Sequence, residues 1–259
     1  MLVLALAQIA TPAHAGAWLQ NEGRGQIIFS GNLSFARQRF AHNGKSLVLP
    51  GRFSKQALTA NVEYGLNTNL TLLAVTGLQH QSIPATNTPS HPVSGVLGLG
   101  AKTRLWQNDR SVVSLQGSFH LGEERNLAGR LRRNDAPAEA DLRVNFGHSF
   151  AVGGLPAFID AQAGYRWRGG RNIDEIRFDL TFGIRPRPDF LVLLQSFNAQ
   201  GVTGNKRFDE GSHRSHKMQI SAVYDLSPIW AVQAGAFTSI HGANSLREKG
   251  AIVALWRKL

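Results

Sequence analysis

One short run of the sequence contains the serine and histidine side chains that a hydrolase uses as nucleophile and general base. Residues 212–216 read Ser-His-Arg-Ser-His. Neighbouring residues of a strand point to opposite faces, so Ser212 and His213 are not expected to act as nucleophile and base. The cluster is therefore a weak candidate for catalysis.

The sequence gives equally weak evidence for a metal or cofactor site. His80, His91 and His120 could approach one another at the outer rim of the fold, but three scattered histidines without carboxylate support are weak evidence for a metal site. The chain has no cysteine, no phosphate-binding loop, no dinucleotide fingerprint and no paired-histidine metalloprotease motif. We expect a protein that is not an enzyme, with no catalytic residue, no cofactor and no metal.

Charged residues in this sequence alternate with apolar ones over long stretches. Arg166 and Arg168 alternate with Tyr165 and Trp167, for example. The charged side chains predicted to share one polar face are Glu63, Lys102, Arg104, Asp141, Arg143, Asp160, Arg166, Arg168, Arg177, Asp179 and Arg185. Seven are basic and four are acidic, so this face would attract anions weakly.

The alternation itself predicts strands with one apolar and one polar face. It is clearest in residues 27–35, 58–64, 142–150, 159–167 and 176–184. With less regular segments included, the sequence predicts an all-β fold of about twelve strands, each long enough to cross a bilayer when tilted; ten or fourteen strands are the alternatives. We expect an antiparallel transmembrane β-barrel whose apolar face meets lipid.

The links between the predicted strands are of two alternating kinds. Short links that contain turn-forming residues are expected at 67–68, 108–109, 153–154, 186–188 and 227–228. Longer links are expected at 41–52, 84–92, 122–138, 169–174, 201–215 and 241–246. Short periplasmic turns and long external loops are typical of outer-membrane barrels.

Aromatic residues are predicted to mark the two membrane interfaces. One girdle is expected beside the short turns and the C-terminus, formed by Tyr64, Trp106, Phe150, Tyr224, Trp230 and Trp256. Tyr165 and Trp167 are expected in the opposite girdle. Leu259 stands where such barrels usually end in phenylalanine, and Trp256 is out of phase with it.

The N-terminus reads as an export signal. Residues 2–9 are largely apolar, and Ala13-His14-Ala15 is a small-x-small pattern that predicts cleavage before Gly16. We therefore expect a signal peptide over residues 1–15 and a single barrel domain over residues 16–259.

The net charge of +11 admits nucleic acid, anionic lipid or anionic solutes as partners. Export argues against nucleic acid. Basic residues in the predicted external loops, within 123–133 and 206–217, could pair with lipopolysaccharide phosphates or could simply be solvated. The expected partners are outer-membrane lipid and small polar or anionic solutes, and the sequence does not predict an oligomeric state.

The mature start resembles that of a family of largely uncharacterised proteobacterial outer-membrane proteins. Gly16-Ala17-Trp18 followed by Gly23-Arg24-Gly25-Gln26 matches its opening motif. The Glu63-Tyr64-Gly65-Leu66 run, leading into Leu70-Thr71-Leu72, is similar to its second hairpin and, more loosely, to barrels linked to uptake of aromatic compounds. The resemblance implies an outer-membrane barrel and no established substrate.

The sequence leaves three functions open. Passive transport of small polar or anionic solutes is favoured by the charged polar face. A non-conducting barrel, filled by ion pairs and interacting through its surface with lipopolysaccharide or exported polymer, is the alternative. A lipid-modifying enzyme would require a convergent Ser, His and acid set, which is not found.

Overall fold

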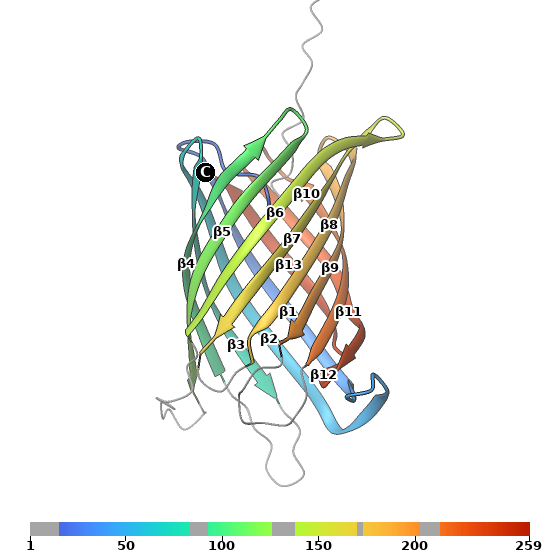
Figure 1. Ribbon diagram of the computed structural model, residues 1–259. Coiled ribbons are helices and arrows are strands. Elements are labelled where there is room, and N and C mark those ends of the chain that lie inside the picture. The colour runs from blue at the N-terminus through green and yellow to red at the C-terminus, as the bar shows by residue number, and fades with distance from the viewer. Residues whose placement is uncertain (1–15, 83–92, 126–137, 170–172, 203–212) are drawn as a thin grey trace, which may run out of the picture.

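The computed structural model describes residues 16–82, 93–125, 138–169, 173–202 and 213–259, and these form one antiparallel barrel (Figure 1). Its strands are β1 (Gly25–Phe40), β2 (Ser46–Asn67), β3 (Leu70–Ser82), β4 (Val93–Gln107), β5 (Ser111–Arg125), β6 (Ala138–Val152), β7 (Leu155–Arg168), β8 (Glu175–Arg187), β9 (Phe190–Gly201), β10 (Arg214–Asp225), β11 (Trp230–Ala243), β12 (Ser245–Leu246) and β13 (Lys249–Lys258). No helix in these residues is long and apolar enough to cross a bilayer.

The barrel is closed by β1, which pairs with β2 on one side and β13 on the other. On the β13 side the register runs from Gln26 opposite Lys258 to Phe35 opposite Lys249. β12 is a two-residue extension that pairs only with the external end of β1. Twelve strands therefore form the wall, as the alternation predicted.

The short links and the C-terminus lie at one end of the barrel (Figure 1, top). One of the two-residue turns at this end is Gly153-Gly154, where both residues have positive φ (58° and 82°), a conformation that glycine adopts without steric cost. By the usual arrangement of outer-membrane barrels this end is periplasmic and the opposite end is external.

Two of the predicted long links are shorter than expected. β2 begins at Ser46, so the link predicted at 41–52 is a tight hairpin whose strands pair up to Phe40 and Ser46, across a register shift after Ala36. β11 extends to Ala243, so only a brief connection precedes β12. Much of the other predicted long links lies outside the described residues, namely 83–92, 126–137 and 203–212. His91 and Ser212 fall within these ranges.

The outer surface of the wall is apolar. Leu58, Leu99 and Val253 are 69%, 65% and 62% exposed, which would be costly in water but is expected where strands face lipid. Trp167 and Trp106, also exposed, lie near opposite ends of their strands, in agreement with the predicted girdles.

Trp256 corrects the girdle prediction. Its ring points into the barrel, where its Nε1 donates a hydrogen bond to Gln233 (3.1 Å) and the ring packs against a buried cluster. Its outward neighbours are Leu255 and Arg257, the latter stacked on Trp230 at 5.3 Å. The out-of-phase position of Trp256 in the sequence was the signal for this placement.

Candidate transport pathway

Residues 16–24, here called the N-terminal segment, enter the lumen at its periplasmic end before β1 begins. Ala17 is completely buried, and its backbone N–H donates to Asp160 (2.6 Å). Its carbonyl accepts a hydrogen bond from Ser114 (2.8 Å), and the carbonyl of Gly16 accepts one from Lys102 (2.8 Å). Side chains from β4, β5 and β7 thus hold the start of the segment.

A second set of contacts fixes Gln20 against the β2–β3 side of the lumen. Its backbone N–H donates to Thr71 (2.9 Å), and its side-chain amide donates to Glu63 (2.9 Å). Glu63 also lies 3.7 Å from the ammonium of Lys102. Lys102 and Asp160 are each only 1% exposed, so the contacts to the N-terminal segment satisfy charges that would otherwise be costly to bury.

Trp18 anchors the segment by packing. Its ring meets Phe158 edge-on, with ring centroids 5.7 Å apart, and joins a buried cluster formed by Phe158, Leu191, Leu193, Val223 and Ala231. A side chain at Gly147 of β6 would begin 2.6 Å from the Trp18 ring, so this glycine makes room for it. The sequence motif Gly16-Ala17-Trp18 therefore marks a segment that fills part of the lumen.

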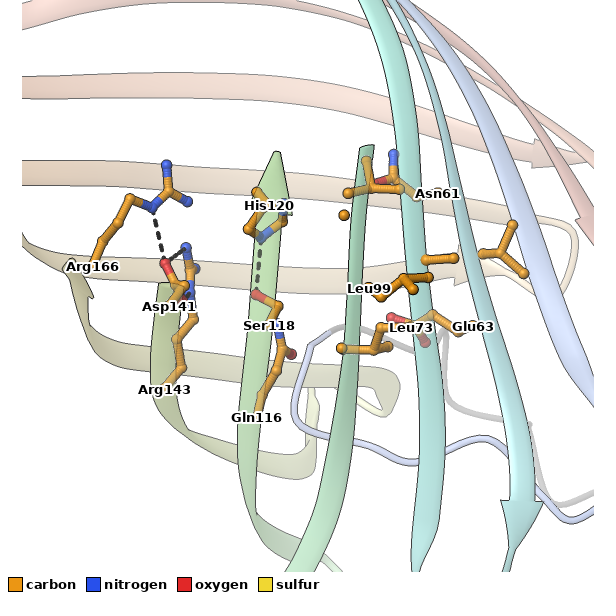
Figure 2. Close-up of a pocket in the computed structure, with 15 residues that line it drawn as sticks. Asn61, Glu63, Leu73, Leu99, Gln116, Ser118, His120, Asp141, Arg143 and Arg166 are labelled. Atoms are coloured by element: carbon orange, nitrogen blue, oxygen red, sulfur yellow. Dashed lines mark hydrogen bonds and ion pairs between the residues drawn. The ribbon is translucent and has the colours of Figure 1, made fainter. Parts of the chain in front are cut away.

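Carboxylates and arginines form a ladder on the inner faces of β6, β7 and β8. Arg143 contacts Asp141 (2.6 Å) and Asp179 (3.0 Å). Arg166 contacts Asp141 (3.1 Å) and Glu139 (3.4 Å). Figure 2 shows Arg166 and Arg143 on either side of Asp141.

The ladder continues toward the external end of the barrel, where Arg168 pairs with both Glu139 (2.8 Å) and Glu175 (3.0 Å). His213 also contacts Glu175 (3.0 Å). Glu139 and Glu175 were not among the predicted residues, although Glu139 precedes Asp141 by two positions in the same alternation. They bring the ladder close to electrical balance.

Arg177 stands apart from the other arginines of this wall. In the described part of the chain its guanidinium makes no hydrogen bond or ion pair, and its Nε is buried without a partner. An arginine left unpaired in this way offers its donors to an anionic solute.

Arg104 and Arg185 lie at the periplasmic mouth and are tied to turns. Arg104 donates to Asn69 of the β2–β3 link (2.8 Å). Arg185 donates to the carbonyl of Pro188 (3.0 Å) and lies 3.3 Å from Asp225. These two arginines thus anchor the ends of hairpins.

The external end contains an ionic cluster that was not predicted. The buried carboxylate of Glu248 contacts both Lys55 (3.1 Å) and Lys217. Burial alone would raise the pKa of Glu248, but the two lysines outweigh burial, and its pKa lies below the usual value. Glu248 lies in the link between β12 and β13, where no strand alternation marks it as inward.

On the opposite wall, the described residues of β9, β10 and β11 form no such ladder. Gln219 donates to Gln195 (2.9 Å), and Gln233 donates to Ser221 (2.9 Å). These amide and hydroxyl groups satisfy one another. The lumen is therefore charged along the β6–β8 side, whereas on the β9–β11 side the charges of Lys217 and Asp225 lie near the two ends and the wall between them is lined by neutral polar groups.

A cavity of about 240 Å³ lies between the ladder and the inner face of β2. Arg143, Arg166 and His120 line one side, and Asn61 and Glu63 line the other (Figure 2). These side chains can solvate a polar or charged solute but present no preformed metal site.

The histidines do not form a catalytic or metal centre in the described residues. Ser118 and His120 share a hydrogen bond (2.9 Å), but the Nδ1 edge of His120 lies against Gly98, not against a carboxylate. His80 is on the outward face of β3, as its register with Gln56 on β2 indicates, so it does not meet His120 as sequence reasoning had allowed. No group of three metal-ligating side chains occurs among the residues that the structure describes.

Several solved structures with a similar fold are outer-membrane channels, porins or translocator domains. No protein-family model and no curated protein matches the chain. The COG4313 outer membrane channel from Pseudomonas putida F1 has a TM-score of 0.68 at 13% identity, with 94% of this chain and 98% of that chain covered. The KdgM porin has a TM-score of 0.53 at 9% identity, with 90% and 98% covered. The translocator domain of the autotransporter NalP from Neisseria meningitidis has a TM-score of 0.54 at 10% identity, with 92% and 89% covered.

Proposed function

We propose that this outer-membrane barrel is a channel for small polar solutes, with a preference for anions, and that the N-terminal segment restricts passage through it. The observation that carries the proposal is Arg177 on the inner face of β8, whose guanidinium makes no hydrogen bond or ion pair with any of the residues that the structure describes. The ladder beside it is nearly balanced, so the predicted excess of basic residues is not what favours anions.

Features of both earlier alternatives occur in this lumen. The ladder is an ion-pair network of the kind that fills a narrow barrel, but it occupies one wall only. A cavity remains between this wall and β2, and the N-terminal segment takes up space at the periplasmic end. The flow of solutes would then depend on how far the N-terminal segment moves out of its position in the lumen.

The test is single-channel conductance of the chain spanning residues 16–259 in planar bilayers. Trp18→Ala removes the anchor of the segment and should raise conductance. Trp230→Ala, at the periplasmic end beside Arg257 on the outer surface, is the matched control and should leave conductance unchanged. A silent Trp18→Ala barrel that is still folded on a heat-modifiability gel would support a non-conducting structural role.

Selectivity is tested in the same bilayers under a salt gradient. Arg177→Gln should move the reversal potential toward cation preference, because it removes an unpaired positive charge from the lumen. Arg187→Gln, on the exposed periplasmic turn, is the control and should not move it. Equal reversal potentials in all three proteins would contradict the anion preference.

A further inference from the structure

A group of four cations lies on the outer surface of the barrel near its external end. Arg37 and Arg39 of β1, Arg52 of β2 and Lys249 of β13 are all exposed, and we call them the external basic patch. Leu33 and Phe35 lie on the outward face of β1, and the alternation places Arg37 and Arg39 on the same face, closer to the external end. The patch therefore starts where the apolar band of β1 ends.

The register brings these cations together around Phe35. Lys249 is directly opposite Phe35 on β13. The Arg52 guanidinium lies over the Phe35 ring, 4.7 Å from its centroid. Arg37 follows within two residues, at the register shift between β1 and β2.

The external basic patch lacks internal compensation. None of its four side chains makes a hydrogen bond to, or an ion pair with, any part of the chain that the structure describes. The lumen cations Lys102, Arg143 and Arg166, in contrast, all contact carboxylates. Uncompensated like charges at this spacing repel one another unless an anion binds between them.

A hollow in the apolar wall lies between the patch and the periplasmic end. The hollow consists of two adjoining grooves of about 420 and 1020 Å³. Both are lined by Gly31, Leu58, Leu78 and Val253. Gly31 forms part of the floor, since a Cβ there would lie 3.5 Å from Leu58 and 3.6 Å from Val253. The grooves run along β1, β2, β3, β11 and β13 and are lined mainly by apolar surface.

We infer that this surface is a binding site for a phosphate-bearing, multiply acylated glycolipid of the outer leaflet, the lipid part of lipopolysaccharide. The guanidinium groups match phosphate oxygens in geometry and charge, and the grooves accept acyl chains below them. The site is separate from the loop residues within 123–133 and 206–217 that the sequence suggested for the same chemistry.

A second copy of the chain fits this surface less well. A two-fold contact through it would bring the two basic patches together, and no carboxylate on the outward faces of β1, β2 or β13 could compensate them. Phosphatidylglycerol offers one phosphate charge and two chains, so it should bind more weakly than a bisphosphorylated glycolipid.

The experiment is native mass spectrometry of the delipidated full barrel after incubation with defined lipids. The probes are bisphosphorylated lipid A, phosphatidylglycerol and phosphatidylethanolamine. Wild type is compared with the triple variant Arg37→Gln/Arg39→Gln/Arg52→Gln. We expect apparent affinity for lipid A to fall by about 100-fold, given roughly a factor of five per basic side chain at an anionic lipid surface.

A matched control removes periplasmic cations. Arg110→Gln/Arg257→Gln neutralises two exposed arginines at the other end of the barrel, one of them also stacked on an aromatic ring. Lipid A binding should be unchanged in this control. An equal fall in both variants, or equal wild-type affinity for lipid A and phosphatidylethanolamine, would overturn the site.

The groove is tested separately by filling it. In Gly31→Leu the new Cβ would lie between Leu58 and Val253, with no backbone atom of the neighbouring strands within 4 Å, so the added side chain starts in the groove without a backbone clash. We expect weaker lipid A binding with conductance through the lumen unchanged. Unaltered binding in Gly31→Leu, together with unaltered binding in the triple variant, would show that the surface holds no specific lipid.

Discussion

Arg143 and Arg177 occupy neighbouring inward positions of one wall, yet their surroundings give them different roles. Arg143 is enclosed by Asp141 and Asp179, so its charge is used inside the protein. Arg177 has no such contact in the described residues. Removing each charge should therefore change a different property of the molecule.

For Arg143→Gln we expect a loss of stability of about 3 kcal/mol, because it removes the arginine that pairs with the largely buried Asp179 and one of the two arginines that pair with Asp141. Arg177→Gln should cost less than about 1 kcal/mol, since it removes an unpaired charge. Urea unfolding in lipid vesicles, followed by tryptophan fluorescence, measures both. Similar losses in the two variants would show that Arg177 is paired after all.

Glu248 predicts a pH dependence of stability. Its pKa is lowered in the folded barrel, so its pairing with Lys55 and Lys217 stabilises the fold above the unfolded-state pKa. That contribution is lost as the pH falls through the folded-state pKa. Glu248→Gln should therefore lower the free energy of unfolding by about 1–3 kcal/mol at pH 7, and by progressively less at acidic pH.

Unfolding of wild type and Glu248→Gln at several pH values checks this expectation. Glu22→Gln is a suitable control, because Glu22 is an exposed carboxylate that forms no ion pair within the described residues. A difference between wild type and Glu248→Gln that stays constant with pH would contradict the assignment.

At the scale of elements, the N-terminal segment depends on space provided by β6. Gly147→Val would place side-chain atoms where the Trp18 ring lies, and Trp18 should leave its site. We expect red-shifted tryptophan emission and a conductance near that of Trp18→Ala. Gly117→Val is the control, because the nearest atom to a Cβ at Gly117 is 4.0 Å away.

The strands were predictable because lipid imposes a period of two on each one. Residues 159–167 and 176–184 alternate cleanly, and β7 and β8 contain them. Gly153-Gly154 was predictable as a turn because positive φ favours glycine. These elements are governed by local rules that a single sequence displays.

The N-terminal segment and the Glu248 cluster were not predictable, because neither lies in an alternating strand. Their partners come from distant parts of the chain: Ala17 and Asp160 are 143 residues apart. The arrangement of ion pairs was hidden for a similar reason. Alternation assigns Arg143 and Arg177 to the same face, but only the register between strands decides which one meets two carboxylates.

At the scale of the whole molecule, closure of the wall between β1 and β13 is directly testable. Ser30 lies opposite Ala254 in the register, and the chain has no native cysteine. Ser30→Cys/Ala254→Cys should form a disulfide on mild oxidation and change migration on a gel. Ser30→Cys/Lys258→Cys, four residues out of register because Lys258 lies opposite Gln26, should not cross-link, and efficient cross-linking there would contradict the register.

The position of Trp18 in the lumen also has a consequence for the order in which the barrel assembles. The segment that carries Trp18 precedes β1, yet its binding site is built from β6, β7, β9, β10 and β11. That site is complete only once β6, β7 and the later strands β9 to β11 have come together around the lumen. We therefore expect the first residues after the predicted cleavage point to be among the last to reach their final position, so that burial of Trp18 would mark the end of barrel assembly.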